Sequence, residues 1–207
     1  MGLQNPDSPV QIRVSPPNKK HLHQQVLFHL FTERLIMTQH QRIIHPIPPL
    51  YDADSRILIL GSFPSVKSRE TMFFYGHPQN RFWRLLASLF NEPAPTSVEE
   101  KKTLALSHHI ALWDSIRSCT ITGSSDSSIR DVVPNDLSII LDNSRVERIF
   151  CNGALSHKMY MKYIFSITGI EATKLPSTSP ANAAYGMDRL EKEWRVITEG
   201  VNSRTNP

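Results

Sequence analysis

Residues 56–61, RILILG, decide the fold of this chain. The run is short and apolar and ends in glycine, which is typical of a parallel β-strand that is buried on both faces. Three further runs have the same character and predict three further strands: HIALWD at 109–114, RIFCNG at 148–153 and ATKLP at 172–176. The segments between and after these runs predict helices, at about 80–90, 97–108, 135–143, 154–165 and 181–198. This alternation predicts an α/β fold, a three-layer α/β/α sandwich with a short, mainly parallel central sheet.

The composition is that of one ordinary soluble domain with room for an extra segment. The chain has 207 residues, of which 40% are apolar and 20% charged. No stretch approaches the roughly 20 apolar residues of a membrane-spanning helix, and the N-terminal sequence lacks the apolar core of a secretory signal, so we expect a cytoplasmic protein. The two cysteines, Cys119 and Cys151, are far apart. Neither a disulfide framework nor a thiolate metal site is expected.

The positive charge of the chain is concentrated near its N-terminus. Residues 1–43 contain five Lys or Arg against two Asp or Glu, whereas residues 44–207 contain 18 against 17. The net charge of +4 is therefore weak support for DNA binding by the body of the protein.

The N-terminal region differs in character from the rest of the chain. Residues 1–25 are rich in Pro, Gln, Asn and Ser, which predicts disorder, and residues 26–36 predict a short amphipathic helix. Translation could instead begin at Met37. We expect three parts in the chain: a disordered extension at 1–43, a catalytic domain at 44–198 and a flexible tail at 199–207.

Two polar loops follow the first predicted strand. The first, GSFPS at 61–65, lacks the glycine pattern of nucleotide-binding loops and could be an ordinary turn after a strand. The second, FYGHPQNRFW at 74–83, allows two compatible interpretations. Asn80 can cap a helix whose Phe and Trp pack in the core. Its carboxamide can equally orient a water, while the Tyr75 ring offers a stacking surface for a flat base.

A third loop, LPSTSPAN at 175–182, combines hydroxyls with two prolines before the last predicted helix. Hydroxyls and free backbone N–H groups near a helix start suit a phosphate, and proline stiffens the loop that carries them. Alone, such a loop is more often a solvated turn. Because ligands of α/β sheets bind beyond the carboxyl ends of the strands, the three loops are expected around one site.

Taken in order, GSFPS, YGHPQNRFW and LPSTSPAN resemble the motifs of the uracil-DNA glycosylase superfamily over about residues 44–198. With IALWDSIRSC and GSSDSSI, they are most similar to its hypoxanthine-DNA glycosylase family, also called DNA-deoxyinosine glycosylases. The resemblance implies that Asn80 positions the attacking water and that the Tyr75 ring stacks on the flipped base. It also implies that the backbone around Ser62 and Phe63 lines the floor of the pocket.

The resemblance gives roles to two further groups of residues. Asp114 matches the place of a base-reading Asn and, as an acceptor, would suit the N1–H of hypoxanthine; a structural ion pair or a cap is the alternative. LPSTSPAN corresponds to the loop that pinches the DNA strand and enters the minor groove. The residues expected to contact DNA are Ser65, Ser177, Thr178, Ser179 and Asn182.

The chain departs from the superfamily pattern at two places. GSFPS contains no water-activating Asp or Asn, and LPSTSPAN contains no His, which both count against uracil as the substrate. His77 stands near the site and is either a catalytic group or a turn residue. No Lys matches the nucleophile of a bifunctional lyase, although Lys67 and Lys174 lie close to the motif loops.

The resemblance therefore implies a monofunctional DNA glycosylase of base excision repair. The enzyme would hydrolyse the N-glycosidic bond of a flipped deaminated base, hypoxanthine above all, in double-stranded DNA, as a monomer and without metal or cofactor. One alternative keeps the chemistry but changes the base to uracil, or to a mispaired uracil or thymine. Another is a catalytically silent nucleic-acid-binding module of the same fold.

Overall fold

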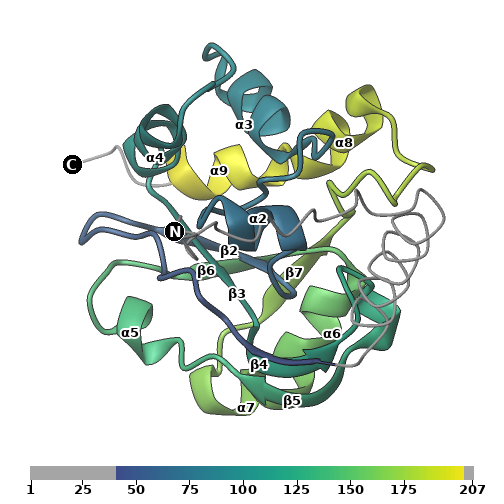
Figure 1. The fold of residues 1–207 in the computed structure, drawn as a ribbon. Helices are drawn as coiled ribbons and strands as arrows, with labels where there is room; N and C mark the ends of the chain where they lie inside the picture. Colours follow the sequence, from purple (N-terminus) through teal and green to yellow (C-terminus); the bar gives the residue numbers. More distant parts are fainter. Residues whose placement is uncertain (1–40, 203–207) are drawn as a thin grey trace, which may run out of the picture. The chain divides into compact units, whose positions relative to one another are not determined.

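The computed structural model describes residues 41–202. Its centre is a four-stranded parallel sheet in the order β3-β2-β6-β7 (Figure 1). All four strands were predicted, within a residue or two of their ends: β2 Ile57–Gly61, β3 Ile110–Asp114, β6 Arg148–Asn152 and β7 Ala172–Leu175. β2 and β3 are buried along their whole length, as continuous apolar runs require. Their carboxyl ends lie side by side, because Gly61 pairs with Asp114.

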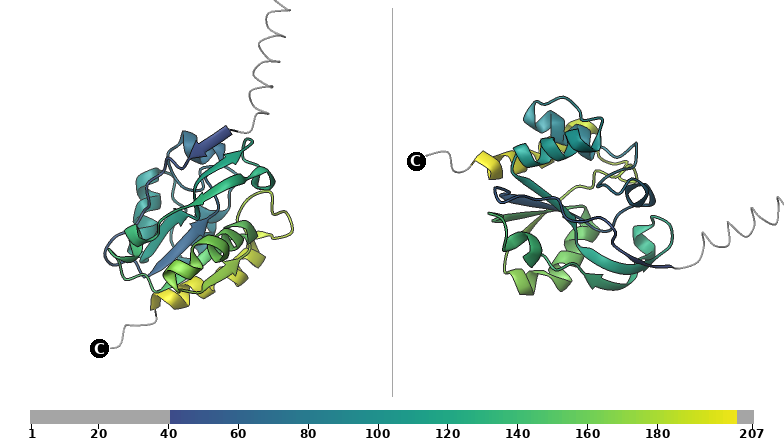
Figure 2. Two further views of the ribbon diagram at one scale, coloured as in Figure 1. Left: turned by 90° about the horizontal axis from the view of Figure 1, so that it is seen from below. Right: turned by 60° about the vertical axis from the view of Figure 1, so that its left-hand side comes forward.

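Helices cover both faces of this sheet (Figure 2). One layer contains α3 Phe82–Phe90, α4 Val98–Ser107, α8 Met187–Trp194 and α9 Val196–Asn202. The other contains α5 Ser138–Leu141, α6 Ala154–Tyr163 and α7 Phe165–Thr168. The short α2, Val66–Glu70, follows β2. The predicted three-layer α/β/α sandwich is confirmed.

The local sequence explains where these helices begin and end. Ser97 and Glu100 form a capping box at the start of α4, as the pattern SVEE predicts. The α3 helix ends at Asn91 in the left-handed conformation, with φ 55°. The apolar side of α3 packs into the core, where Phe82 is fully buried with Trp194 of α8.

A second, antiparallel sheet was not predicted. It contains β1 Gln41–Ile44, β4 Ile116–Ile121 and β5 Arg130–Pro134, in the order β1-β4-β5. Its sequence alternates poorly: in β4, Ser118 and Cys119 are both buried, and bulges interrupt the pairing with β5. The strand β1 begins before residue 44, where the sequence suggested that the domain starts. The sheet carries the 122–128 segment to the ends of the parallel strands.

The last predicted helix, 181–198, starts later than expected and is divided at Arg195. The stretch 181–186 forms turns because the Arg81 side chain binds carbonyl groups of this loop. The helix predicted at 135–143 is reduced to α5, and that at 154–165 is interrupted at Ile164. The helix expected at 26–36 lies outside the described residues. Within residues 41–202, no helix is both long and apolar enough to cross a membrane.

Candidate active site

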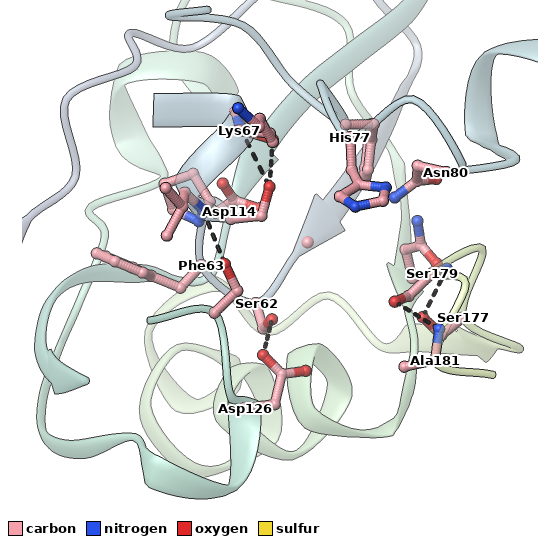
Figure 3. A pocket seen from close by; sticks show the side chains of 18 of the residues that line it. Ser62, Phe63, Lys67, His77, Asn80, Asp114, Asp126, Ser177, Ser179 and Ala181 are labelled. Atoms are coloured by element: carbon pink, nitrogen blue, oxygen red, sulfur yellow. Dashed lines mark hydrogen bonds between the residues drawn. The ribbon is translucent and has the colours of Figure 1, made fainter. Parts of the chain in front are cut away.

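A cavity of about 690 Å³ opens at the carboxyl ends of the parallel strands (Figure 3). Loops after β2, β4 and β7 surround it, together with the segment before α3. Nine of the ten residues that the sequence assigned to the site line this cavity: Ser62, Phe63, Ser65, Tyr75, Asn80, Asp114, Ser177, Thr178 and Ser179. His77 lines it as well, and Asn182 does not.

Asp114 forms part of the cavity wall and is held there by a buried histidine. Its Oδ2 lies 2.7 Å from Nε2 of His45, whose side chain is 2% exposed. The backbone N–H of Ile47 donates to Nδ1 of His45 at 3.2 Å, so the ring proton belongs on Nε2 and is donated to Asp114. The residue therefore has a structural partner and also faces the cavity, as both interpretations of it require.

Gly61 makes room for this carboxylate. A Cβ at position 61 would overlap Oδ1 of Asp114 and would lie 3.6 Å from the Tyr75 hydroxyl. Any side chain here would push the carboxylate away from its place. The two polar groups thus gather around one backbone position, where a base edge can meet both.

The Tyr75 ring is fixed against α3. Its backbone is in the left-handed region, with φ 54°, and its ring stacks on Phe82 with centroids 3.9 Å apart and planes inclined by 25°. One face of the ring is therefore covered by the protein. A flipped base would have to stack on the other face, or meet the ring at its edge.

The Tyr75 hydroxyl is buried and has no hydrogen-bond partner among the described residues. Burial raises the pKa of Tyr75 strongly and the charge of Asp114 raises it further, while Asn152 lowers it. The amide of Asn152 lies near the hydroxyl but has its hydrogen bonds to Thr178, one from each amide atom. Tyr75 therefore remains protonated at neutral pH and is a hydrogen-bond donor without an acceptor.

Asn80 belongs to a hydrogen-bond chain whose directions are fixed. The backbone N–H of Thr178 donates to Oδ1 of Asn152 at 2.9 Å, and Nδ2 of Asn152 donates to the Thr178 hydroxyl at 2.9 Å. That hydroxyl must then donate to Oδ1 of Asn80, at 2.9 Å, and the backbone N–H of Phe82 donates to the same oxygen at 3.0 Å. Both lone pairs of Oδ1 are used. The cap residue of α3 is Arg81, so the expectation that Asn80 is the cap is wrong by one residue, although its Oδ1 still accepts from the first N–H of the helix. Only the amide N–H groups of Asn80 are left for a ligand.

Arg81 ties the 175–182 loop to the start of α3. Its backbone N–H and Nε both donate to the carbonyl of Thr178, at 3.1 and 3.2 Å. Its terminal nitrogens donate to the carbonyls of Ser179, Asn182 and Tyr185. A planar guanidinium is suited to such a cluster of carbonyls because its five N–H groups point outward in a fixed fork.

The hydroxyl-rich loop has an inner and an outer side. Ser177 and Ser179 are half-buried on the cavity wall, where a ligand can reach them. Thr178 is 0% exposed, and its backbone and hydroxyl are bonded inside the protein. Asn182 donates to the Ser177 carbonyl at 2.9 Å. Thr178 and Asn182 therefore hold the loop through internal hydrogen bonds, unlike Ser177 and Ser179, which line the cavity.

The residues of the loop 61–65 differ in their contacts. Phe63 is 8% exposed and packs against the second sheet, edge-on to His45. Ser65 caps α2 by accepting from the backbone N–H of Ser68 at 3.2 Å. Ser62 donates from its hydroxyl to Oδ1 of Asp126 at 3.4 Å (Figure 3).

Four residues of the site were missed from the sequence: His45, Arg81, Asp126 and Asn152. Asn152 ends a predicted strand, and that position was a usable signal for a cavity residue. Arg81 was read only as a helix residue. Asp126 lies in the quoted motif GSSDSSI, but no role was predicted for it. His45 gave no signal, because the unpredicted second sheet brings it to the cavity.

Comparison with known proteins agrees with this architecture. A family model described as the uracil DNA glycosylase superfamily matches residues 48–199. The chain belongs to the uracil DNA glycosylase superfamily. The match includes the four parallel strands and all three loops around the cavity, so the cavity occupies the part of the chain that defines the family.

Two relatives in this superfamily are named hypoxanthine DNA glycosylase. The one from Methanosarcina acetivorans is 35% identical over 151 residues, which are 72% of this chain and 94% of the relative. The one from Methanosarcina barkeri is 35% identical over 137 residues, or 65% and 85% of the two chains. A solution NMR structure from Methanosarcina acetivorans, assigned to the uracil DNA glycosylases, is also similar. It has a TM-score of 0.66 and 32% identity, and the match covers 77% of this chain and 99% of that one.

Proposed function

We propose that this superfamily member is a monofunctional DNA glycosylase that removes hypoxanthine from double-stranded DNA, as a monomer. The observation that carries the proposal is the pair of groups beside Gly61. Asp114 offers an acceptor that His45 holds in place, and the Tyr75 hydroxyl offers a donor without an acceptor. The names of the two Methanosarcina relatives support the same substrate.

This pair of groups suits the edge of a deaminated base. Hypoxanthine has an N1–H donor next to an O6 acceptor, whereas adenine has an N1 acceptor next to an amino donor. With the sugar fixing the orientation of the base, Asp114 would accept from N1–H and Tyr75 would donate to O6. Adenine would place its N1 acceptor against the Asp114 carboxylate and its amino group against the Tyr75 hydroxyl. Each polar group that is buried without a partner costs about 1–3 kcal/mol of binding free energy.

The remaining steps follow from the loops around the cavity. The nucleotide must leave the duplex, at a cost of a few kcal/mol that is lowest for a mispaired base. The loop that Arg81 holds presents Ser177 and Ser179 for the DNA strand. An Asn80 N–H can hold a water for attack on the anomeric carbon, and backbone N–H groups near Ser62 can stabilise the leaving purine.

Single-turnover cleavage of end-labelled duplexes tests this function. Each duplex carries hypoxanthine, uracil, xanthine or thymine opposite each normal base, and alkali then cuts the abasic product. We expect hypoxanthine to be released fastest, with no strand cut before alkali and no borohydride-trapped adduct. Faster release of uracil or mispaired thymine would favour the alternative substrates, and binding without any release would favour a silent nucleic-acid-binding module.

A further inference from the structure

Hydrolysis requires a proton acceptor for the attacking water, and Asn80 is not available for that role. Both lone pairs of its Oδ1 accept internal hydrogen bonds, from Phe82 and from Thr178. Its N–H groups can hold a water but cannot take its proton. Another group that lines the cavity must do so.

The side chains that could take a proton and line the described cavity are His77 and two carboxylates, Asp114 and Asp126. Nδ1 of His77 already accepts from the backbone N–H of Gln79, so its ring proton lies on Nε2 and neither ring nitrogen is a free acceptor. Asp114 is 5% exposed, and one of its oxygens is bonded to His45. Asp126 belongs to the short turn Asp126–Ser128 between β4 and β5, which is exposed to solvent at the rim of the cavity. Its Oδ1 reaches across to the Ser62 hydroxyl at 3.4 Å, on the loop after β2 (Figure 3). Asp126 therefore lies at the solvent-facing rim of the cavity, while Asp114 lies deeper.

The surroundings of Asp126 make it a stronger base than an ordinary aspartate. Loss of solvent raises the pKa of its carboxyl, although part of the residue reaches water, and the nearby charge of Asp114 raises it as well. The Ser62 hydroxyl lowers the pKa. The charged and titratable groups around it include the Cys119 thiol, Arg69, which donates to the Gly123 carbonyl, and Arg130, which donates to the Ser127 carbonyl. Lys67 and His77 line the same cavity.

We propose that Asp126 is the catalytic base of the hydrolysis, an inference that rests on the proposed glycosylase function. The water oxygen bonds to C1′ of the sugar while the bond from C1′ to the base nitrogen breaks. The electron pair of that bond leaves with the base, and the proton of the water passes to Asp126. The departing base anion then takes up a proton, so the products are the free base and an abasic site.

This assignment also explains a departure in the sequence. The loop 61–65, GSFPS, has no carboxylate or carboxamide of its own. The segment GSSDSS at 123–128 brings one to that loop from a different strand, through the contact between Asp126 and Ser62. The second sheet thereby completes the site.

The test compares Asp126→Asn with wild type in single-turnover release of hypoxanthine across pH. The matched control is Asp131→Asn, an exposed carboxylate on the same hairpin but outside the cavity, which should behave as wild type. We expect Asp126→Asn to lower the rate by about 10²-fold or more. The wild-type rate should rise with pH as Asp126 loses its proton, and the variant should lack that rise while it still binds the duplex.

Chemical rescue separates a base from a merely structural residue. Formate added to Asp126→Ala should restore part of the rate, because a small carboxylate can enter the vacated space and accept the proton. If wild type releases hypoxanthine and Asp126→Asn does so at the same rate and with the same pH profile, the role of Asp126 is wrong. The proposed glycosylase function would still hold. Loss of rate with an unchanged pH profile and no rescue would overturn it too. No release by wild type would overturn both.

Discussion

At the scale of single residues, the orientation of the Asn80 amide is the sharpest feature of the site. Asn80→Asp keeps the oxygen that accepts from Phe82 and Thr178, but replaces the N–H groups that face the cavity. We expect its single-turnover rate to fall about 10²-fold, because water is no longer held by a donor.

Asn80→Ala is the control for this prediction. It removes the oxygen that accepts from Phe82 and Thr178 as well as the donor, so we expect an added loss of about 1 kcal/mol in the free energy of unfolding, seen in urea denaturation. An Asn80→Asp enzyme as fast as wild type would show that no N–H donor is needed at position 80, and would contradict the proposed water-holding role of the Asn80 amide.

The Tyr75 hydroxyl permits a second prediction at this scale. Because it is buried without a partner, Tyr75→Phe should keep or raise the free energy of unfolding, by up to about 1 kcal/mol, while the ring still stacks on Phe82. The same change should slow release of hypoxanthine, which loses its donor to O6, and should not slow release of unsubstituted purine. A clear loss of stability would instead reveal a partner for the hydroxyl.

At the scale of elements, one side chain holds the 175–182 loop. Arg81→Ala removes the hydrogen bonds to its carbonyls and should lower the free energy of unfolding by about 2–3 kcal/mol. Hydrogen exchange should speed up at residues 177–182 before it changes in the central sheet. Arg84→Ala, an exposed arginine on the same helix, is the control. Equal exchange in both variants would mean that the loop is held by other contacts.

Helices and strands were predictable from the sequence where a pattern within one segment was enough to specify them. The apolar run of β2 and the capping pattern of α4 specified their elements directly. The antiparallel sheet and the late start of α8 depend on long-range contacts, the pairing of β4 with two strands and the bonds of Arg81. A pattern within one segment cannot encode either of them.

The residues of the site were likewise predictable only where a sequence motif contains them. The sequence motifs found the groups on the loops, including Asn80, Tyr75 and Asp114. They did not reveal which atoms of these groups are free, because that follows from partners such as His45 and Thr178. They included Asp126, within GSSDSSI, but did not indicate its role, because a turn beside the second sheet brings it to the cavity.

At the scale of the whole molecule, we predict that the described domain is sufficient for stability and catalysis. A chain that begins at Met37 should unfold at the same temperature as the full chain and release the same base at a rate within about two-fold. Its affinity for undamaged duplex should depend less on salt, because four of the five basic residues of 1–43 are removed. An unstable short chain would show that the domain needs residues 1–36.

The central claim is that Asp114 reads the N1–H of a flipped hypoxanthine. The most direct measurement is single-turnover release of hypoxanthine and of 1-deazahypoxanthine, which has C–H in place of N1–H, by wild type and by Asp114→Asn. We predict that wild type prefers hypoxanthine by about 10²-fold, and that the variant binds the duplex but loses this preference. A wild-type enzyme that releases both bases equally well would contradict the account.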